Sequence, residues 1–387
     1  MQIREGNESM EKKEINVAVI GNGSRGCAVV RNLLRDSERK VHVIAAYDPD
    51  SGETDRCLEM WGSPGAKRCA SSLEAVRTQG VDWVMVFSPN AFHKQHILEG
   101  FAAGKHVFSE KPLATSIADC AEIFDAWKKA QVLFATGFVL RYAPLYRKAK
   151  EILDSGRLGR IISIDANEHI APAHGGYIMC NWRRHSKLAG PHILEKCCHD
   201  LDLINWFCGS LPSCVSAFGG RDFFKPENRF LEAKYGVKTF HSWRDPHGAE
   251  TPFTDDTDLM DNMVAAAEFR NRIRVAFSCT MSNARPERRM RFCCTEGTIE
   301  LELYSGNLKY RNLADEGVTV IDLAGGGHGG GDDYIMKELY ECMCTGSTPK
   351  CGGSEGLESA VFALALDEAA RTGKVVDLEP VWRRLAR

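Results

Sequence analysis

The sequence predicts an α/β protein in which a doubly wound parallel sheet is followed by an α+β domain with a large, mostly antiparallel open sheet. Its 387 residues suffice for two domains with separate cores. Strand-like and helix-like segments alternate in the first part of the chain, which is typical of a parallel sheet covered by helices on both faces. In the second part, strand-like runs follow one another without regular helices between them, which is typical of antiparallel sheets.

The alternation begins at residues 15–20, a short β-rich run, followed by a helix-like segment at 25–34 and a second strand at 41–47. Asp48-Pro49-Asp50 ends that strand, because these residues favour turns. We therefore expect a flexible tail at 1–14 and a first domain at 15–138. Its later elements are strands at 83–87, 106–108 and 132–137 and helices at 93–103 and 117–130.

The remaining residues, 139–387, are predicted to form the second domain. Residues 219–258 are polar and rich in Pro, Asp and His, and we expect an insertion or mobile loop near the site there. A glycine-rich stretch at 325–331 is the one segment of low complexity. The predicted strands of this domain lie at 161–166, 264–269, 273–279, 291–294 and 298–303, and its helices at 145–155, 333–343 and 355–371.

Composition disfavours several classes of protein. The net charge is −3 and the basic residues are scattered, so nothing indicates a nucleic-acid surface. No apolar run approaches the roughly 18 to 20 residues of a membrane helix, and the polar start does not resemble a signal peptide. The 15 cysteines are scattered without paired C-x-x-C strings, and we interpret them as small buried apolar residues in a reducing compartment. These features predict a cytoplasmic protein with a small-molecule ligand.

A glycine motif, Gly21-Asn22-Gly23-Ser24-Arg25-Gly26, follows the first strand and opens the first helix. G-x-G-x-x-G allows a tight turn, close approach of the backbone to a pyrophosphate, and close packing of helix and strand. Asp48, at the end of the second strand, can accept hydrogen bonds from ribose hydroxyls and would repel a 2′-phosphate. The motif predicts a Rossmann domain that binds NAD, with NADP as the alternative, although a purely structural βα turn would also use glycines.

Further motifs follow in order, and together with the glycine motif they resemble the glucose-fructose oxidoreductase and inositol dehydrogenase family, Gfo/Idh/MocA. The Glu-Lys-Pro string is the most specific of them, and the resemblance covers nearly the whole chain. The motifs are Val81-Asp82-Trp83-Val84, Ser88-Pro89-Asn90 with His93, Gly104-Lys105-His106-Val107, Glu110-Lys111-Pro112, Arg141-Tyr142-x-Pro144 and the segment 190–202.

The resemblance implies a second α/β domain that binds substrate against the nicotinamide and whose open sheet forms homodimers or homotetramers. It also implies that Lys111 contacts the reacting hydroxyl and that His199 is the acid/base. Many family members have aspartate where this chain has Glu195. The cofactor-binding residues implied are Gly21, Asn22, Gly23, Ser24, Arg25, Gly26, Asp48, Ser88, Pro89, Asn90, His93, Glu110 and Lys111.

The chemistry of these residues supports the same catalytic set, Lys111, His199 and Glu195. Oxidation of a secondary alcohol requires a base within hydrogen-bond reach of the hydroxyl, ideally with a pKa near the working pH. Histidine begins there, and a lysine pKa can be lowered by burial and by the positive nicotinamide ring. Glu195 and His199, at i and i+4, would share one face of a helix, so the carboxylate could orient the imidazole.

Each assignment has a plainer alternative. Lys111 could be a surface lysine, although Pro112 after it predicts a rigid turn that can be cis. Glu195 and His199 could form a purely structural pair. The two could also bind zinc together with Cys198, but no further ligand cluster has convincing spacing, and we predict no metal.

Several residues are candidates for substrate binding beside Lys111 and His199. Arg183 next to Trp182 can hold a carboxylate, a phosphate or a sugar hydroxyl, or can be a solvated turn. Lys196 is a weaker candidate that the resemblance suggests. His328 could close over substrate or belong to a mobile linker. Asp200 and Asp202 are interpreted as structural, and Tyr142 and Pro144 as hinge packing.

The sequence therefore predicts an NAD(P)-dependent oxidoreductase that transfers a hydride between nicotinamide and a secondary hydroxyl or ketone of a sugar, an inositol-like polyol or a sugar acid. Two alternatives belong to other classes. One is a glycosidase or lyase that uses NAD for transient oxidation with no net redox change. The other is a regulator that binds sugar or dinucleotide, which the presence of both Lys111 and His199 disfavours.

Overall fold

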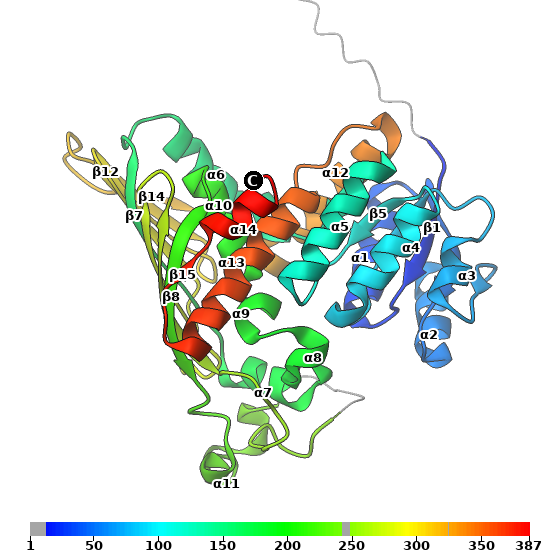
Figure 1. The fold of residues 1–387 in the computed structure, drawn as a ribbon, viewed down its shortest axis with the longest axis horizontal. Coiled ribbons are helices and arrows are strands. Elements are labelled where there is room, and N and C mark those ends of the chain that lie inside the picture. Colours follow the sequence, from blue (N-terminus) through cyan, green and yellow to red (C-terminus); the bar gives the residue numbers. More distant parts are fainter. Residues whose placement is uncertain (1–12, 242–247, 324) are drawn as a thin grey trace, which may run out of the picture.

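The computed structural model describes residues 13–241, 248–323 and 325–387. Two sheets, each with its own helices, lie side by side (Figure 1). The tail predicted at 1–14 lies almost wholly outside the described residues. Within the described residues, no helix combines the length and the apolar composition needed to cross a membrane.

The first sheet has six strands in the order β3-β2-β1-β4-β5-β6, and every pair is parallel. The strand order reverses at β1, the position where doubly wound sheets bind ligands at the carboxyl ends of their strands. The prediction of a doubly wound parallel sheet is confirmed. The strands are β1 (Ile15–Ile20), β2 (Val41–Tyr47), β3 (Lys67–Arg68), β4 (Trp83–Val86), β5 (His106–Ser109) and β6 (Phe134–Thr136).

Helices connect these strands: α1 (Ser24–Asp36), α2 (Ser51–Trp61), α3 (Ser72–Val76), α4 (His93–Ala102) and α5 (Ile117–Ala130). Capping explains where two of them begin. The Asp50 side chain accepts from the backbone N–H of Gly52 at the start of α2, and Ser116 accepts from Asp119 at the start of α5. The sequence did not predict α2, β3 or α3.

The second sheet has nine strands in the order β14-β13-β12-β11-β7-β10-β9-β8-β15, and only its β7–β10 pair is parallel. The predicted mostly antiparallel sheet is confirmed. Its strands are β7 (Ile161–His169), β8 (Pro212–Gly220), β9 (Asn262–Phe269), β10 (Arg274–Thr280), β11 (Arg289–Cys294), β12 (Gly297–Glu302), β13 (Asn307–Asn312), β14 (Thr319–Asp322) and β15 (Val376–Asp377).

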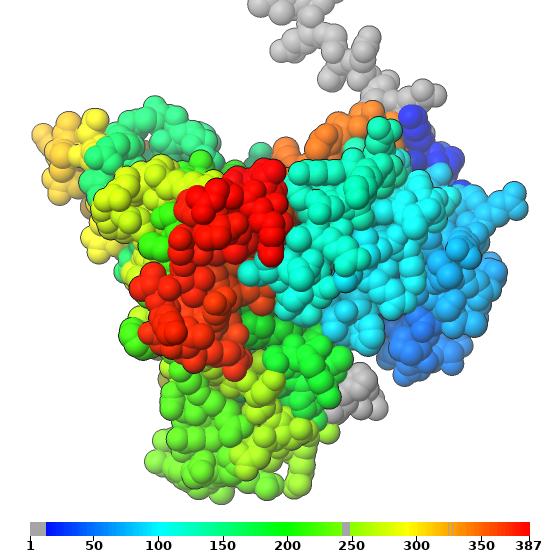
Figure 2. All heavy atoms as spheres, in the orientation of Figure 1, coloured from blue at the N-terminus to red at the C-terminus, as the bar shows by residue number. Residues whose placement is uncertain are grey.

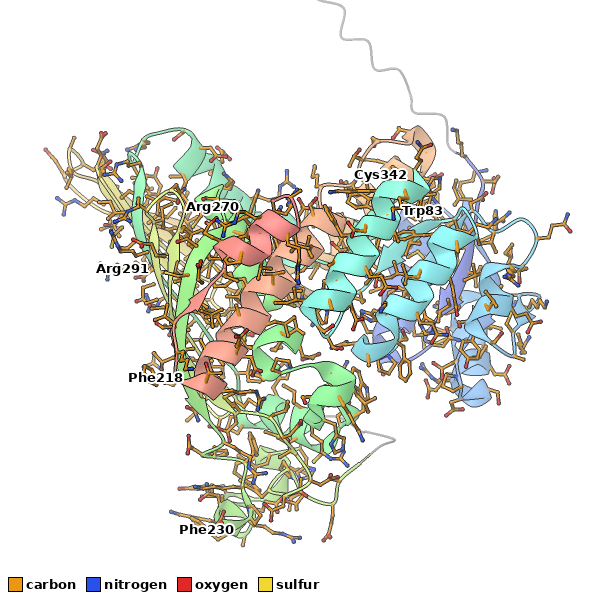
Figure 3. All side chains as sticks on the ribbon, viewed as in Figure 1. Trp83, Phe218, Phe230, Arg270, Arg291 and Cys342 are labelled. Carbon is orange, nitrogen blue, oxygen red and sulfur yellow. The ribbon has the colours of Figure 1, made fainter. Side chains whose placement is uncertain are left out.

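Helices cover one face of this sheet and leave the other face uncovered. Phe218 of β8 and Arg291 of β11 lie on the uncovered face (Figure 3). Phe218 is 76% exposed, whereas its neighbour Ala217 is buried, as expected for a strand with one solvent face. The helices that follow β6 along the chain are α6 (Pro144–Asp154), α7 (Pro172–Cys180), α8 (Ser186–Ala189), α9 (His192–Glu195), α10 (Cys198–Cys208), α11 (Phe230–Tyr235), α12 (Asp332–Thr345), α13 (Gly353–Thr372) and α14 (Glu379–Arg384), with short 3₁₀ turns at η2 (Val139–Tyr142), η3 (Trp182–Arg184) and η6 (Gly327–Gly330).

Helix α12 belongs to the first half of the molecule by its contacts, although it lies far along the chain. Ile335, Met336 and Leu339 of α12 are buried in the same apolar cluster as β1 and α1. The orange segment that contains α12 lies against the N-terminal part in Figure 2. The Tyr142 hydroxyl donates to the Glu338 carboxylate at 2.9 Å, so η2 is also tied to α12.

The segment 219–258, the predicted insertion or mobile loop, contains regular elements in its described part. Strand β8 runs on to Gly220, and the described part of the segment contains η4 (Pro226–Asn228), α11 and η5 (Val237–Thr239). It packs through aromatic rings, and residues 242–247 lie outside the description. The mostly polar composition concealed a small apolar cluster: Ile170, Ile178, Met179, Phe224, Phe240, Phe253, Leu259 and Met281.

Candidate active site

The three glycines of the first βα turn are required for three different reasons. Gly21 has φ +90°, and a Cβ there would collide with the backbone of Phe87 and Ser88. A Cβ on Gly26 would lie 2.5 Å from the carbonyl oxygen of Gly21. A Cβ on Gly23 would meet no described atom within 4 Å. The backbone is therefore open at the middle glycine, where the fingerprint requires close approach of a pyrophosphate.

The ends of the neighbouring elements suit an anionic ligand with a ribose. The start of α1 has no side-chain cap and no acidic residue in its first turn, so its N–H groups can bind an anion. The carboxylate of Asp48 accepts from the backbone N–H of Asn22 at 2.7 Å, which holds it beside the glycine turn. The buried Asn22 donates in turn to Thr54 of α2 at 2.9 Å.

Two other predicted cofactor residues, His93 and Arg25, are bound mainly by groups of the protein itself. Both ring nitrogens of the buried His93 lie 2.8 Å from backbone carbonyls, of Ser88 and Pro112, so this side chain holds two turns together. Arg25 is bound by the carboxylates of Glu110 at 2.7 Å and Asp332 at 2.8 Å. His93 and Arg25 therefore hold neighbouring turns and side chains of the site in place.

Lys111, at the end of β5, reaches across to the second half of the molecule. Its Nζ donates to the backbone carbonyl of Glu195 at 2.6 Å and lies 3.8 Å from the Glu195 carboxylate. Burial lowers the pKa of Lys111, but Glu195 together with Cys198 and Glu110 raises it by more, so the pKa is raised overall. The sequence-based expectation of a lowered pKa for Lys111 is therefore wrong for the protein without bound cofactor. The peptide bond from Lys111 to Pro112 is cis.

Glu195 is held by cations rather than by the histidine. Its Oε1 accepts from Nε of Arg183 at 3.0 Å, and the Arg183 guanidinium lies 4.2 Å from the centre of the Trp182 ring. Burial alone would raise the pKa of Glu195, but Lys111 and Arg183 lower it. The prediction that Glu195 and His199 share one face of a helix is wrong, because α9 ends at Glu195 and α10 begins at Cys198.

His199 lies on the first turn of α10 and is 3% exposed. Its ring packs edge-on against Phe138 and lies 5.8 Å from the ring of His328. No described group bonds to Nδ1. Burial, and then the positive charges of Lys111 and Arg288, lower the pKa of His199 well below its usual value. The imidazole is therefore neutral at physiological pH.

His328 occupies a strained position above His199 and continues the network to the glycine turn. Its φ is +48°, a region that residues other than glycine rarely adopt. Its Nδ1 lies 2.7 Å from the Asp332 carboxylate, which also binds Arg25. Contacts thus run from Glu110 through Arg25 and Asp332 to the two histidines. His328 therefore lies beside His199 and is hydrogen-bonded to Asp332.

Lys196 meets a buried acidic group that sequence reasoning missed. Its Nζ lies 3.6 Å from the carboxylate of Glu168, and Arg288 lies 3.1 Å from the same oxygen. Burial raises the pKa of Glu168, but Arg288 and Lys196 lower it to about 2. Arg288 also binds Asp200 through two hydrogen bonds, at 2.7 and 2.8 Å, which is a structural role for Asp200.

The structure also bears on the interpretation of Asp202 and on the zinc alternative. Arg141 forms two hydrogen bonds with Asp202, each of 2.8 Å, so Asp202 also has a structural partner. Glu195, Cys198 and His199 are not among the clusters of described residues whose ligand atoms lie within 4.8 Å of one another. The structure therefore does not support the zinc alternative in that form.

Known proteins resemble this chain over part of its length. The chain is 30% identical over 235 residues to an inositol 2-dehydrogenase of Gluconacetobacter diazotrophicus (58% of this chain, 65% of that protein). It is 29% identical over 211 residues to a 2,7-anhydro-N-acetylneuraminate hydratase of Escherichia coli K12, covering 53% of each chain. Both alignments span less than two thirds of the relative.

Solved structures share the fold over almost the whole chain. A levoglucosan dehydrogenase in complex with NADH and levoglucosan has a TM-score of 0.77 at 18% identity, covering 94% of this chain and 99% of that one. Residues 15–138 match the model of an oxidoreductase family with an NAD-binding Rossmann fold, and residues 150–378 match its C-terminal α/β domain. The chain therefore belongs to the Gfo/Idh/MocA family of oxidoreductases.

Proposed function

We propose that this protein is an NAD-dependent dehydrogenase that oxidises a secondary hydroxyl of a sugar, an inositol-like polyol or a sugar acid, or reduces the corresponding ketone. The observation that carries the proposal is that Lys111 forms a hydrogen bond and an ion pair with Glu195, beside a neutral, buried His199. The inositol dehydrogenase among its relatives and the levoglucosan dehydrogenase among its structural neighbours support this substrate class.

The glycine turn fits the dinucleotide. Gly23 leaves room for a pyrophosphate, and the start of α1 presents free N–H groups to it. When bound, NAD accepts a hydride from the substrate carbon during oxidation and returns it during reduction. Asp48 would hold the ribose hydroxyls at the adjacent strand end.

The carboxylate of Asp48 predicts that NAD binds more tightly than NADP, because a 2′-phosphate would be repelled. Titration of both cofactors checks this expectation. Asp48→Ala should narrow the difference between the two dissociation constants. Tighter binding of NADP by the unaltered protein would contradict the assignment of Asp48 to the ribose.

The charge states divide the proton chemistry between two side chains. Lys111 stays protonated beside Glu195, so it can donate a hydrogen bond to the substrate hydroxyl but cannot take its proton. Neutral His199 can take that proton. Glu195 keeps Lys111 charged and in place, and Arg183 fixes Glu195. The lysine orients and the histidine acts as base in oxidation.

The function is tested by supplying NAD with sugars, inositols and sugar acids in turn and following the absorbance of the reduced nicotinamide. A substrate of this class should produce NADH in the unaltered protein and much less in Lys111→Ala. Failure of every class, with NAD binding confirmed by titration, would contradict the proposal.

A second candidate uses the same chemistry without net redox. The hydratase among the relatives favours transient oxidation next to a bond that is broken or hydrated. Such an enzyme would convert anhydrosugars or glycosides while no NADH accumulates. Product analysis beside the absorbance assay separates the two candidates.

We also propose a homo-oligomer that pairs through the uncovered face of the nine-stranded sheet. Phe218 and Val264 are directly paired in the β8–β9 register and are 76% and 64% exposed. Exposed apolar pairs of this kind are typical of protein interfaces. A cytoplasmic location fits the 15 free cysteines, because a reducing compartment keeps thiols unpaired.

A further inference from the structure

His192, the first residue of α9, has an unusual environment for a histidine. It is 4% exposed, and no described group bonds to either of its ring nitrogens. A neutral imidazole offers a lone pair on one of its two ring nitrogens. A buried polar atom without a partner is unfavourable, so this ring is a candidate ligand for an ion.

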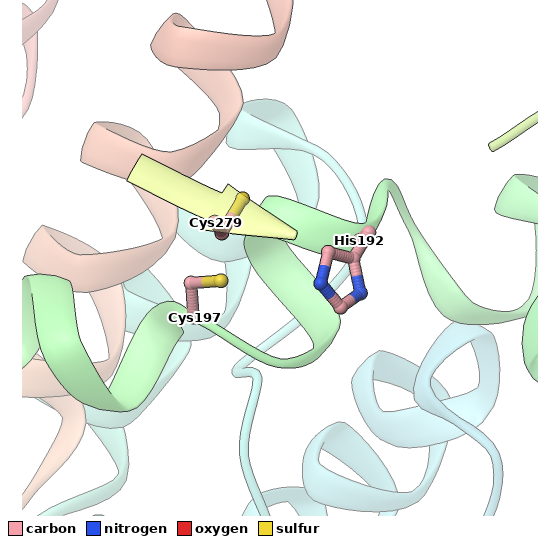
Figure 4. A group of neighbouring side chains, drawn as sticks. All are labelled: His192, Cys197 and Cys279. Atoms are coloured by element: carbon pink, nitrogen blue, oxygen red, sulfur yellow. The ribbon is translucent and has the colours of Figure 1, made fainter. Parts of the chain in front are cut away.

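Two thiols lie beside this ring. Cys197, between α9 and α10, and Cys279 of β10 are both buried, and Figure 4 shows the three side chains next to one another. One ligand atom from each of the three residues lies within 4.8 Å of the others. Two sulfurs and an imidazole nitrogen from three separate segments are the donors typical of structural zinc sites.

Glu168 lies next to this cluster, in a second group that it forms with Cys197 and Asp200. It is the register partner of Cys279 on the adjacent strand β7, and its carboxylate lies within 4.8 Å of the Cys197 sulfur. It is fully buried, and neither oxygen has a hydrogen-bond partner among the described residues, although Arg288 and Lys196 form ion pairs with it.

We propose that His192, Cys197 and Cys279 bind a zinc ion, with Glu168 as the fourth ligand. Tetrahedral zinc with bonds of 2.1–2.3 Å holds its donor atoms about 3.5–3.8 Å apart. The donors of His192, Cys197 and Cys279, now within 4.8 Å of one another, must therefore move by about 1 Å or less, which side-chain rotation can supply. The Glu168 carboxylate must move further. Two thiolates and a divalent cation add no net charge to the buried network, so the ion offsets the cost of ionising the thiols.

The site would be structural, because its donors are all buried protein groups. It would tie the segment that carries Glu195 to the centre of the second sheet. A recess of about 10 Å³ borders the site on the side of His192 and Cys279. This site differs in all three primary donors from the Glu195, Cys198 and His199 set considered from the sequence.

Cobalt substitution tests the proposal. The full-length protein, reduced and stripped of metal by a chelator, is titrated with Co²⁺, which reports thiolate ligands by charge-transfer absorption in the near ultraviolet. We expect this absorption to saturate at about one ion per chain and to disappear when Zn²⁺ is added. Zn²⁺ alone should also raise the Tm of the stripped protein.

Cys279→Ala and His192→Leu should lose both the absorption and the rise in Tm. Cys208→Ala removes a buried thiol outside the cluster and should keep both, so it is the matched control. Absence of the absorption from the unaltered protein, or its persistence at full strength in Cys279→Ala, would overturn the proposal. If a variant does not fold, the titration of the unaltered protein still decides, because it requires thiolate absorption and a stoichiometric end point.

Discussion

At the scale of single residues, the pairing of Lys111 with Glu195 decides which side chain can accept a proton. A lysine alone in a buried site would lose its charge, but here the carboxylate lies 3.8 Å away and the backbone carbonyl of Glu195 accepts a hydrogen bond. The cation is therefore retained. His199, which has no anionic partner among the described residues and several cations nearby, stays neutral instead.

Lys111→Ala should lower turnover at least a hundredfold while leaving NAD affinity nearly unchanged, because the lost hydrogen bond acts on the reacting hydroxyl. Steady-state kinetics and cofactor titration measure the two effects separately. Lys129→Ala, which removes an exposed lysine of α5, is the control. Turnover near that of the unaltered protein would remove Lys111 from the mechanism.

With His199 as the proposed base, its lowered pKa sets the expected pH dependence of oxidation. The base form persists as the pH falls through 6.5, and it is lost only at the lower pKa of the buried ring. We therefore expect the acid limb of kcat/KM to lie below pH 6.5 and to vanish in His199→Asn, whose residual rate should be about 10²–10⁴-fold lower. A limb of unchanged position and a full rate in His199→Asn would show that another group is the base.

At the scale of elements, the βα turn separates a binding glycine from a packing glycine. Gly23→Ala should leave the Tm nearly unchanged, because the new methyl group meets open space, but should weaken NAD binding at least about tenfold. Gly26→Ala should destabilise the fold by about 1–3 kcal/mol, because its Cβ would lie 2.5 Å from the backbone oxygen of Gly21.

Thermal unfolding and cofactor titration of both glycine variants check this contrast. The two substitutions are chemically identical and lie on the same turn, so each is the control for the other. Equal losses of stability would mean that Gly23 is also required for packing.

Elements with a local signal could be predicted from the sequence, and elements that depend on distant partners could not. β1, α1 and β2 have an apolar pattern and turn residues of their own. α2 also had a signal that was missed, since its buried residues Thr54, Cys57, Leu58 and Trp61 follow helical spacing after the Asp50 cap. β8 contains Pro212 and ends in two glycines, and it is a strand because β9 pairs with it.

The same distinction holds within the site. Lys111, Glu195 and His199 were found through short motifs and the family resemblance. Glu168 and Arg288 were not, because they come from β7 and from the residue before β11, and only the pairing of those strands brings them together. No spacing in the sequence marks a contact of this kind.

At the scale of the whole molecule, the uncovered face of the second sheet is the surface through which we propose that copies of the chain pair. Phe218→Asp together with Val264→Asp should convert the oligomer into smaller species, because two charges would be placed on a paired apolar surface. Light scattering after size-exclusion chromatography measures the mass. Tyr235→Asp alters an exposed aromatic residue of α11 and should leave the mass unchanged.

The position of α12 has a consequence for synthesis on the ribosome. The sheet of the nucleotide domain is translated early, but Ile335, Met336 and Leu339, which complete its apolar cluster, are translated near the end. When the nascent chain has left the exit tunnel as far as β6, the surface of α1 that α12 later covers is therefore still exposed. Chaperones that bind apolar segments have a target there for most of the time that translation takes.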